Sequence, residues 1–206
     1  MSKFDDQYID LCKRILAHGE KVTNYKKTDK RSKKVASAIP DHRAQATSAA
    51  ETIRLPHQVL QFDLEEEFPI LVSKQVGFKT AVLEILWIYQ VASNDVRWLQ
   101  ERNVKIWNEW EIAEDGTYQG RNINEIYAKS HPNEPKEDFA HTIGTAYGWI
   151  VKKYNLINNL IETLKENPGN RRMIMSLWQN EWLPTAALPS CVWNSQWNLI
   201  DGNLNI

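Results

Sequence analysis

The stretch RRMIMSLWQNEWLPTAALPSCVWNSQWNLI, residues 171–200, decides the fold class because it holds two apolar strand patterns joined by a loop. RRMIMSLW follows the turn Asn167-Pro168-Gly169 and is followed by the loop LPTAALPS. CVWNSQWNLI then leads to Asp201-Gly202, the strongest short pattern for a hairpin turn, and to a short partner strand, NLNI. The sequence therefore predicts neighbouring strands of one sheet.

Helical spacing occurs in three places outside this stretch. Apolar residues from Phe4 to Leu16 recur every three or four positions, and Gly19 is placed to end that helix. The segment 78–89, FKTAVLEILWIY, is apolar nearly all round a helix and predicts burial on several sides. The segment 154–164 has an amphipathic stripe. Helices and strands without internal repeats predict a single α/β or α+β domain over residues 1–206.

The other segments carry weaker patterns. Residues 53–62 and FPILVSKQV, 68–76, look like strands interrupted by Pro56 and Pro69. Ser93-Asn94-Asp95 offers an N-cap for a following short helix. The polar region 111–141 predicts a surface insertion away from the functional centre. Seven basic residues from Lys21 to Val35 predict an exposed loop.

Composition narrows the class of protein. Twenty-five Lys plus Arg against twenty-six Asp plus Glu give a net charge of −1, which favours neither nucleic acid nor membrane as a partner. The two cysteines cannot build a disulfide framework and have no zinc-ligand spacing, so no metal is expected. No signal peptide and no run near the ~20 apolar residues of a membrane span are present. We expect a protein of the reducing cytoplasm.

Two residues are candidates for chemistry by their local setting. Cys191 follows Pro189-Ser190, and it is either a buried core thiol or a nucleophile. The histidines lie in polar loops without a recognisable signature, whereas a nearby arginine could lower the thiol pKa. Glu84 lies among Leu83, Ile85 and Leu86 with no local partner. It is either a helix-surface glutamate or a carboxyl with a raised pKa, poised for proton transfer.

Four further side chains have a functional and a structural interpretation. Arg171 and Arg172 precede a strand, so their guanidinium groups should point to opposite sides and suit either a phosphate or structural ion pairs. Trp107 and Trp110 of IWNEW are three residues apart and form either core or a ring platform. Cys12 lies on the first predicted helix and is expected to be a core thiol.

Several blocks occur in a specific order: FPILVSKQV, LEILWIYQVASNDVRWL, VKIWNEW, AYG, NPGNRRMIMSLW and ALPSC. This order resembles the thymidylate synthase family, in particular the bacterial subgroup with Val after the catalytic cysteine, as Val192 is here. The likeness runs from about Phe68 to Ile206. It implies an α+β fold in which a sheet packs with helices.

The resemblance also implies an activity and a set of catalytic residues. Cys191 would be the nucleophile that adds to carbon 6 of the pyrimidine of deoxyuridylate. The co-substrate 5,10-methylenetetrahydrofolate would supply a one-carbon unit and a hydride, giving thymidylate and dihydrofolate. Glu84 would organise water and protons around the pyrimidine carbonyl, and Tyr147 of AYG would assist proton removal from carbon 5.

The resemblance places the remaining binding residues as well. Trp107 and Trp110 would line the folate side. Arg171 and Arg172 resemble the pair that crosses a homodimer interface to hold the phosphate in the neighbouring subunit. Arg43 matches the family's own-chain phosphate arginine, although DHRAQAT lacks the RTGT-like context.

The resemblance leaves alternatives open at the end of the sequence. Family members continue past the strand that ends at Ile206, so a C-terminally truncated family domain is expected. One alternative is a deoxypyrimidylate hydroxymethyltransferase, because the asparagine that separates pyrimidines would lie in the missing segment. Another is an inactive remnant that dimerises or binds nucleotide.

Overall fold

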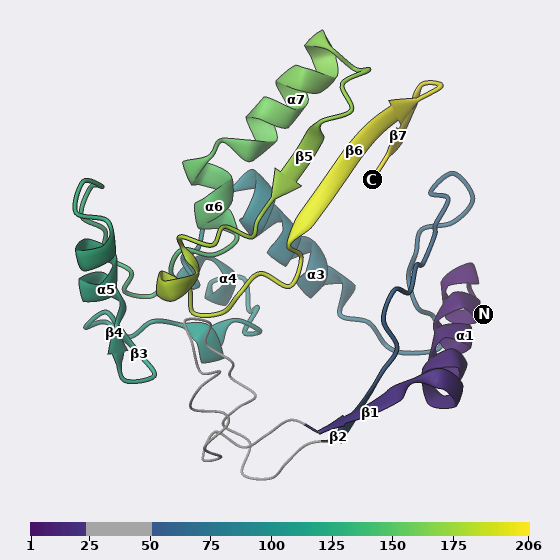
Figure 1. Ribbon diagram of the computed structural model, residues 1–206, viewed down its shortest axis with the longest axis horizontal. Helices are drawn as coiled ribbons and strands as arrows, with labels where there is room; N and C mark the ends of the chain where they lie inside the picture. Colours follow the sequence, from purple (N-terminus) through teal and green to yellow (C-terminus); the bar gives the residue numbers. More distant parts are fainter. Residues whose placement is uncertain (24–50) are drawn as a thin grey trace. The chain divides into compact units, whose positions relative to one another are not determined.

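The computed structural model of the chain describes residues 1–23 and 51–206, which form helices and small sheets (Figure 1). The described residues divide into two compact units. One unit comprises residues 1–23 and 51–78, and the other comprises residues 79–206.

The first unit begins with helix α1, Lys3–His18, which confirms the predicted N-terminal helix. Ser2 caps α1 in a capping box with Asp5. The Ser73 hydroxyl and amide donate to Oδ1 of Asp5 at 2.5 Å and 3.1 Å. These hydrogen bonds hold the pKa of the buried Asp5 well below its ordinary value. The start of α1 is thereby fixed to the loop around Ser73.

A two-stranded antiparallel sheet follows α1, with β1 at Glu20–Thr23 and β2 at Glu51–Arg54. The expectation of a loop from Lys21 is therefore wrong for residues 21–23, and residues 24–35 lie outside the described residues. Residues 55–76 contain no strand, so the predicted strands are limited to β2. Pro56 and Pro69 lack an amide donor, which is why this apolar segment does not extend a sheet. Cys12 is half-buried rather than a core thiol.

Helix α3, Phe78–Ile85, continues as a π-helical turn over Leu86–Gln90 (η2). The predicted helix over 78–89 is confirmed, but its predicted burial on several sides is wrong. Trp87 and Ile88 are buried, and the exposed side chains of this segment include Phe78, Val82, Ile85 and Leu86. The core of the second unit therefore receives the end of the segment, together with the half-buried Leu83 on one side of α3.

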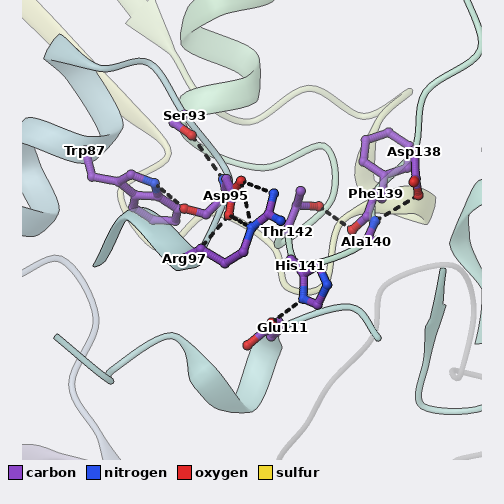
Figure 2. A network of polar contacts seen from close by, with 10 residues as sticks. All are labelled: Trp87, Ser93, Asp95, Arg97, Glu111, Asp138, Phe139, Ala140, His141 and Thr142. Atoms are coloured by element: carbon purple, nitrogen blue, oxygen red, sulfur yellow. Dashed lines mark hydrogen bonds and ion pairs between the residues drawn. The ribbon is translucent and has the colours of Figure 1, made fainter. Parts of the chain in front are cut away.

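Helix α4, Arg97–Gln100, follows a polar network that Figure 2 shows. Oδ1 of Asp95 accepts the Arg97 amide at 2.9 Å, and the Arg97 guanidinium forms an ion pair with the same carboxylate. The indole N–H of Trp87 donates to the Asp95 carbonyl at 2.9 Å. Burial opposes the charge on Asp95, but the hydrogen bonds from Arg97 dominate and lower its pKa. The short helix after Ser93-Asn94-Asp95 is confirmed, but the predicted N-cap in this segment is wrong, because the N-cap position is Val96, which forms no side-chain capping bond. Asp95, one residue earlier, instead accepts the first amide of the helix.

The region 111–141 is part of the core, so its prediction as a surface insertion is wrong. After the 3-10 turn η3, Asn108–Trp110, it contains β3 (Thr117–Tyr118), β4 (Arg121–Asn122) and α5 (Ile123–Ser130). Its buried side chains are Ile112, Tyr118, Ile123, Tyr127 and Phe139. Nδ1 of His141 lies 2.8 Å from Oε1 of Glu111 and joins the two ends of the region (Figure 2).

Two helices and a three-stranded sheet complete the second unit. Helices α6, Gly148–Lys153, and α7, Leu156–Glu166, precede strands β5, Met173–Ser176, β6, Asn194–Ile200, and β7, Asn203–Asn205. The strands are antiparallel in the order β5-β6-β7. Helix α7 lies along β5 (Figure 1), where Leu160 packs with Met173 and Met175.

The hairpin between β6 and β7 confirms the prediction from Asp201-Gly202. Both residues have positive φ, 51° and 84°, which a tight primed turn requires. Strand β6 begins only at Asn194, so Cys191 precedes the strand instead of starting it. The mixture of helices and small antiparallel sheets is an α+β fold, as expected. Within the described ranges, no helix has the length and apolar character that crossing a membrane requires.

Candidate active site

Cys191 lies between the 3-10 turn η4, Leu183–Thr185, and strand β6, and its side chain is exposed. The Cys191 amide donates to the hydroxyl of Tyr147 at 2.7 Å. The hydroxyl of the preceding, buried Ser190 donates to the Leu177 carbonyl at 3.3 Å. The backbone is therefore held while the residue itself is exposed, which excludes the interpretation of Cys191 as a buried core thiol.

Tyr147 stands at the start of α6 in a strained backbone conformation, with φ 46° and ψ −106°. Burial raises its pKa to about 12, so the phenol keeps its proton near neutral pH. Gly148 follows, and a Cβ there would overlap with the Ser93 backbone. The close approach of residue 93 to residue 148 thus fixes the place from which Tyr147 reaches Cys191.

Glu84 is half-buried on α3 and accepts a hydrogen bond from Nε1 of Trp107 at 2.8 Å. Burial raises the pKa of this carboxyl, and the hydrogen bond from Trp107 opposes that rise only in part. Glu84 therefore retains its proton to a higher pH than an ordinary glutamate. This property fits the sequence interpretation of a carboxyl poised for proton transfer.

Trp107 connects these groups. Its ring centroid lies 5.4 Å from that of Tyr147 and 5.5 Å from that of Trp110. Trp107 is only 7% exposed, whereas Trp110 is half-buried. Contacts therefore run from Glu84 through Trp107 to Tyr147 and on to Cys191, and the structure brings five of the sequence-predicted residues together.

Arg171 and Arg172 stand apart from this chain of contacts, in the turn before β5, and both are exposed. The Arg172 amide donates to Oδ1 of Asn170 at 2.9 Å. Neither guanidinium forms an ion pair with any residue in the described ranges, which argues against a structural ion pair within the chain. Arg43 lies outside the described residues.

Three polar residues that support the site were missed by the sequence analysis. Nδ2 of Asn94 donates to the Gly144 carbonyl at 2.7 Å, and the hydroxyls of Thr145 and Thr185 pair at 2.8 Å. The partners are far apart in sequence, so no local pattern could have indicated them. No group of His, Cys, Asp or Glu in residues 1–23 and 51–206 could hold a metal ion.

Replacing Glu84 by Gln should raise the melting temperature at neutral pH, by about 1–3 °C. A carboxyl with a raised folded pKa lowers stability as pH rises from the ordinary glutamate pKa through the folded pKa. Gln removes that cost and still offers Trp107 an acceptor oxygen. Thermal melts at several pH values would measure the difference, which should vanish at acidic pH. A difference that persists at acidic pH would contradict burial of the charge as its cause.

The fold and the site together define the class of protein. It is an α+β protein with a candidate nucleophilic centre, in which an exposed cysteine is held by a buried tyrosine that contacts an indole cluster and its half-buried carboxyl partner. The thymidylate synthase family model matches residues 6–206. The chain belongs to the thymidylate synthase family, as its motifs predicted.

Similar proteins agree with this assignment. The chain is 40% identical over 205 residues to a thymidylate synthase of Clostridium beijerinckii, covering 100% of this chain and 60% of that protein. It is 32% identical over 215 residues to that of Bacillus licheniformis, covering 100% and 63%. The solved thermostable thymidylate synthase A from Bacillus subtilis matches with a TM-score of 0.70 and 30% identity, covering 98% of this chain and 61% of that one. The chain thus spans less than two thirds of the length of these relatives.

Proposed function

We propose that this chain forms the nucleophilic part of a thymidylate synthase centre. The reaction would be the reductive methylation of deoxyuridylate to thymidylate with 5,10-methylenetetrahydrofolate. The observation that carries the proposal is the exposed Cys191 held by the Tyr147 hydroxyl, with the Tyr147 ring in contact with Trp107 and the Trp107 indole hydrogen-bonded to Glu84. Because the relatives are longer than this chain, the proposal concerns the centre to which these residues contribute.

Cys191 supports the proposal by its exposure, which an incoming pyrimidine ring needs. Its sulfur would form a bond to carbon 6, and the electrons of the C5–C6 double bond would move towards the carbon 4 carbonyl. Carbon 5 would thereby become nucleophilic. Carbon 5 would bond to the one-carbon unit and lose its proton, and tetrahydrofolate would then leave to give an exocyclic methylene. A hydride from tetrahydrofolate would reduce that methylene to a methyl group, giving dihydrofolate, and the electrons would expel the Cys191 thiolate and restore the C5–C6 double bond.

Tyr147 and Glu84 would assist the proton transfers in these steps. The high pKa of Tyr147 means that its hydroxyl would orient a water molecule for removal of the carbon 5 proton, not act as a phenolate. Glu84 would supply or hold a proton at the pyrimidine carbonyl, since burial raises its pKa. The two groups are linked through Trp107, which contacts both.

The folate would lie on the side of Trp110. Trp110 is half-buried and offers an aromatic surface of the kind on which a flat heterocycle can rest. Trp107 is nearly fully buried, so its part would be to support Trp110. The bound folate would supply the one-carbon unit and the hydride.

We also propose a cytoplasmic homodimer in which Arg171 and Arg172 hold the phosphate in the partner's site. Both side chains are exposed and form no ion pair with a described residue, so they are available to a phosphate. The sheet face away from α7 exposes Ile174 and Ile200, which a second copy would cover. Arg43 would hold the phosphate of its own chain. Residues 1–206 would form a single family domain, since one family model spans both units.

The deciding experiment follows dihydrofolate formation from deoxyuridylate and methylenetetrahydrofolate by absorbance, with thymidylate identified by mass. It compares the chain with a fusion that adds the part of the Clostridium beijerinckii protein outside the match, because the relatives are longer. Thymidylate with equal dihydrofolate is the expected result for the fusion. A hydroxymethylated nucleotide without dihydrofolate would replace the proposal by the hydroxymethyltransferase alternative, and no product would reject both.

Arg171→Ala and Cys191→Ser fusions should each be nearly inactive alone, but a mixture of refolded subunits should regain activity. Random pairing makes half of the dimers mixed, and each mixed dimer has one complete site, so about one quarter of the native activity should return. Activity after mixing, corrected for the two parents, measures this. No recovery would show that Arg171 does not serve the partner's site.

A further inference from the structure

Two segments converge on the candidate nucleophile. The segment 143–147 ends at Tyr147, and the segment 185–191 ends at Cys191. The Ala187 amide donates to the Ile143 carbonyl at 3.0 Å, and the Thr145 amide donates to the Thr185 carbonyl at 3.3 Å. The segments therefore pair antiparallel around Gly144 and Ala186, and beyond this pairing the Cys191 amide reaches the Tyr147 hydroxyl.

A buried pair of hydroxyl groups lies where the two segments pair, next to Gly144 and Ala186. Thr145 is 2% exposed and Thr185 is 0% exposed. Their Oγ1 atoms are 2.8 Å apart, and Oγ1 of Thr145 lies 2.7 Å from the Trp182 carbonyl oxygen. Each hydroxyl carries one proton, so one consistent arrangement has Thr145 donating to Trp182 and Thr185 donating to Thr145.

This arrangement depends on register. A shift of one segment along the other would separate the two hydroxyls and take the buried Thr145 hydroxyl away from the Trp182 carbonyl, which is costly. The Thr185 hydroxyl would keep a local acceptor, because its Oγ1 lies 3.1 Å from the same carbonyl oxygen. The backbone pairing around Gly144 resists the same shift, because a Cβ at Gly144 would already overlap with the Thr185 carbonyl. The hydroxyl pair therefore selects one alignment of the two segments.

We propose that Thr145 and Thr185 are positioning residues for Cys191. Their hydroxyl pair sets the register of segments 143–147 and 185–191, and that register places the Tyr147 hydroxyl on the Cys191 amide. The functional meaning of this positioning rests on the proposed role of Cys191 as nucleophile. The positioning itself can be measured without turnover.

The test uses the two cysteines of the chain, Cys12 and Cys191. Labelling with 15N-cysteine gives one amide resonance for each, and exchange of each amide with water is measured by NMR. In Thr185→Val, exchange of the Cys191 amide should become about tenfold faster, because its hydrogen bond to Tyr147 is lost or weakened. Tyr147→Phe, which removes the acceptor, sets the upper limit, and Cys12 on α1 is the internal reference.

Two control variants separate positioning from general loss of packing. Thr185→Ser keeps the hydroxyl and should restore slow exchange at Cys191. Thr163→Val removes a half-buried hydroxyl on α7 that donates to the Asn159 carbonyl at 2.7 Å, and it should leave Cys191 unchanged. If Thr185→Val does not fold, Thr145→Val takes its place with the same expected result.

Two outcomes would overturn the proposal. In one, Cys191 exchange is unchanged in Thr185→Val although Tyr147→Phe accelerates it. In the other, a uniformly 15N-labelled sample of the valine variant shows buried amides throughout residues 79–206 accelerated as much as that of Cys191, which indicates a structural role only. The proposed nucleophile role is tested by a different measurement, because it fails if turnover survives in Cys191→Ser. Failure of the positioning proposal and failure of the proposed function are therefore distinguishable.

Discussion

Cys191→Ser in the relative-length fusion should abolish thymidylate formation, with kcat falling by at least about a thousandfold. Serine is nearly isosteric, but its hydroxyl is a far weaker nucleophile than a thiolate near neutral pH. Cys191 is exposed, and the hydrogen bond from its amide to Tyr147 does not need the sulfur, so this bond should persist in the serine variant. The assay is dihydrofolate formation, together with deoxyuridylate affinity by calorimetry.

Affinity for deoxyuridylate should change by less than about threefold in Cys191→Ser, because binding before the covalent step does not need the sulfur. The matched control is Cys12→Ser, which alters the other, half-buried cysteine on α1 and should retain turnover. Turnover retained in Cys191→Ser would exclude the nucleophile role. Loss of both turnover and nucleotide binding would point to a structural role for Cys191 instead.

Gly144→Ala should be strongly destabilising, at roughly 3 kcal/mol or more. Gly144 has φ 70°, and an added Cβ would overlap with the backbone carbonyl of Thr185, which a small rotamer change cannot relieve. The strain would act where segments 143–147 and 185–191 pair. Urea denaturation followed by tryptophan fluorescence measures the loss.

Substitutions at two other glycines separate the cost of the positive φ from the cost of the overlap with Thr185. Gly120 has a similar φ, 75°, but nothing within 4 Å of an added Cβ, so Gly120→Ala should cost only about 1–2 kcal/mol. Gly169 has neither a positive φ nor a close neighbour, and Gly169→Ala should be near neutral. Equal losses for Gly144→Ala and Gly120→Ala would show that the backbone moves to relieve the contact with Thr185.

Local patterns predicted the elements whose causes are local. The Asp201-Gly202 hairpin follows from two residues that accept positive φ, and helix α7 ends where Asn167-Pro168-Gly169 prevents continuation. The prolines at 56 and 69 acted in the same local way, although the apolar residues around them had suggested strands. Dihedral preferences of a few neighbouring residues decide such features.

Burial could not be predicted in the same way. The apolar segment 78–89 proved exposed over much of its length, and the polar region 111–141 contributed Tyr127 and Phe139 to the core. Which surface of a segment is covered depends on the elements that pack against it. Those elements come from distant parts of the sequence, so hydrophobic periodicity alone gave the wrong answer in both cases.

The sequence by itself determined the family, through motif order, and named Glu84, Tyr147 and Cys191 as candidate catalytic residues. Only the tertiary structure decided that the Tyr147 hydroxyl holds the amide of a cysteine 44 residues away. It also decided that two threonines 40 residues apart share one buried hydrogen-bonding arrangement. Such contacts have no local pattern, because the desolvation of a buried hydroxyl or carboxyl depends on which distant segments surround it.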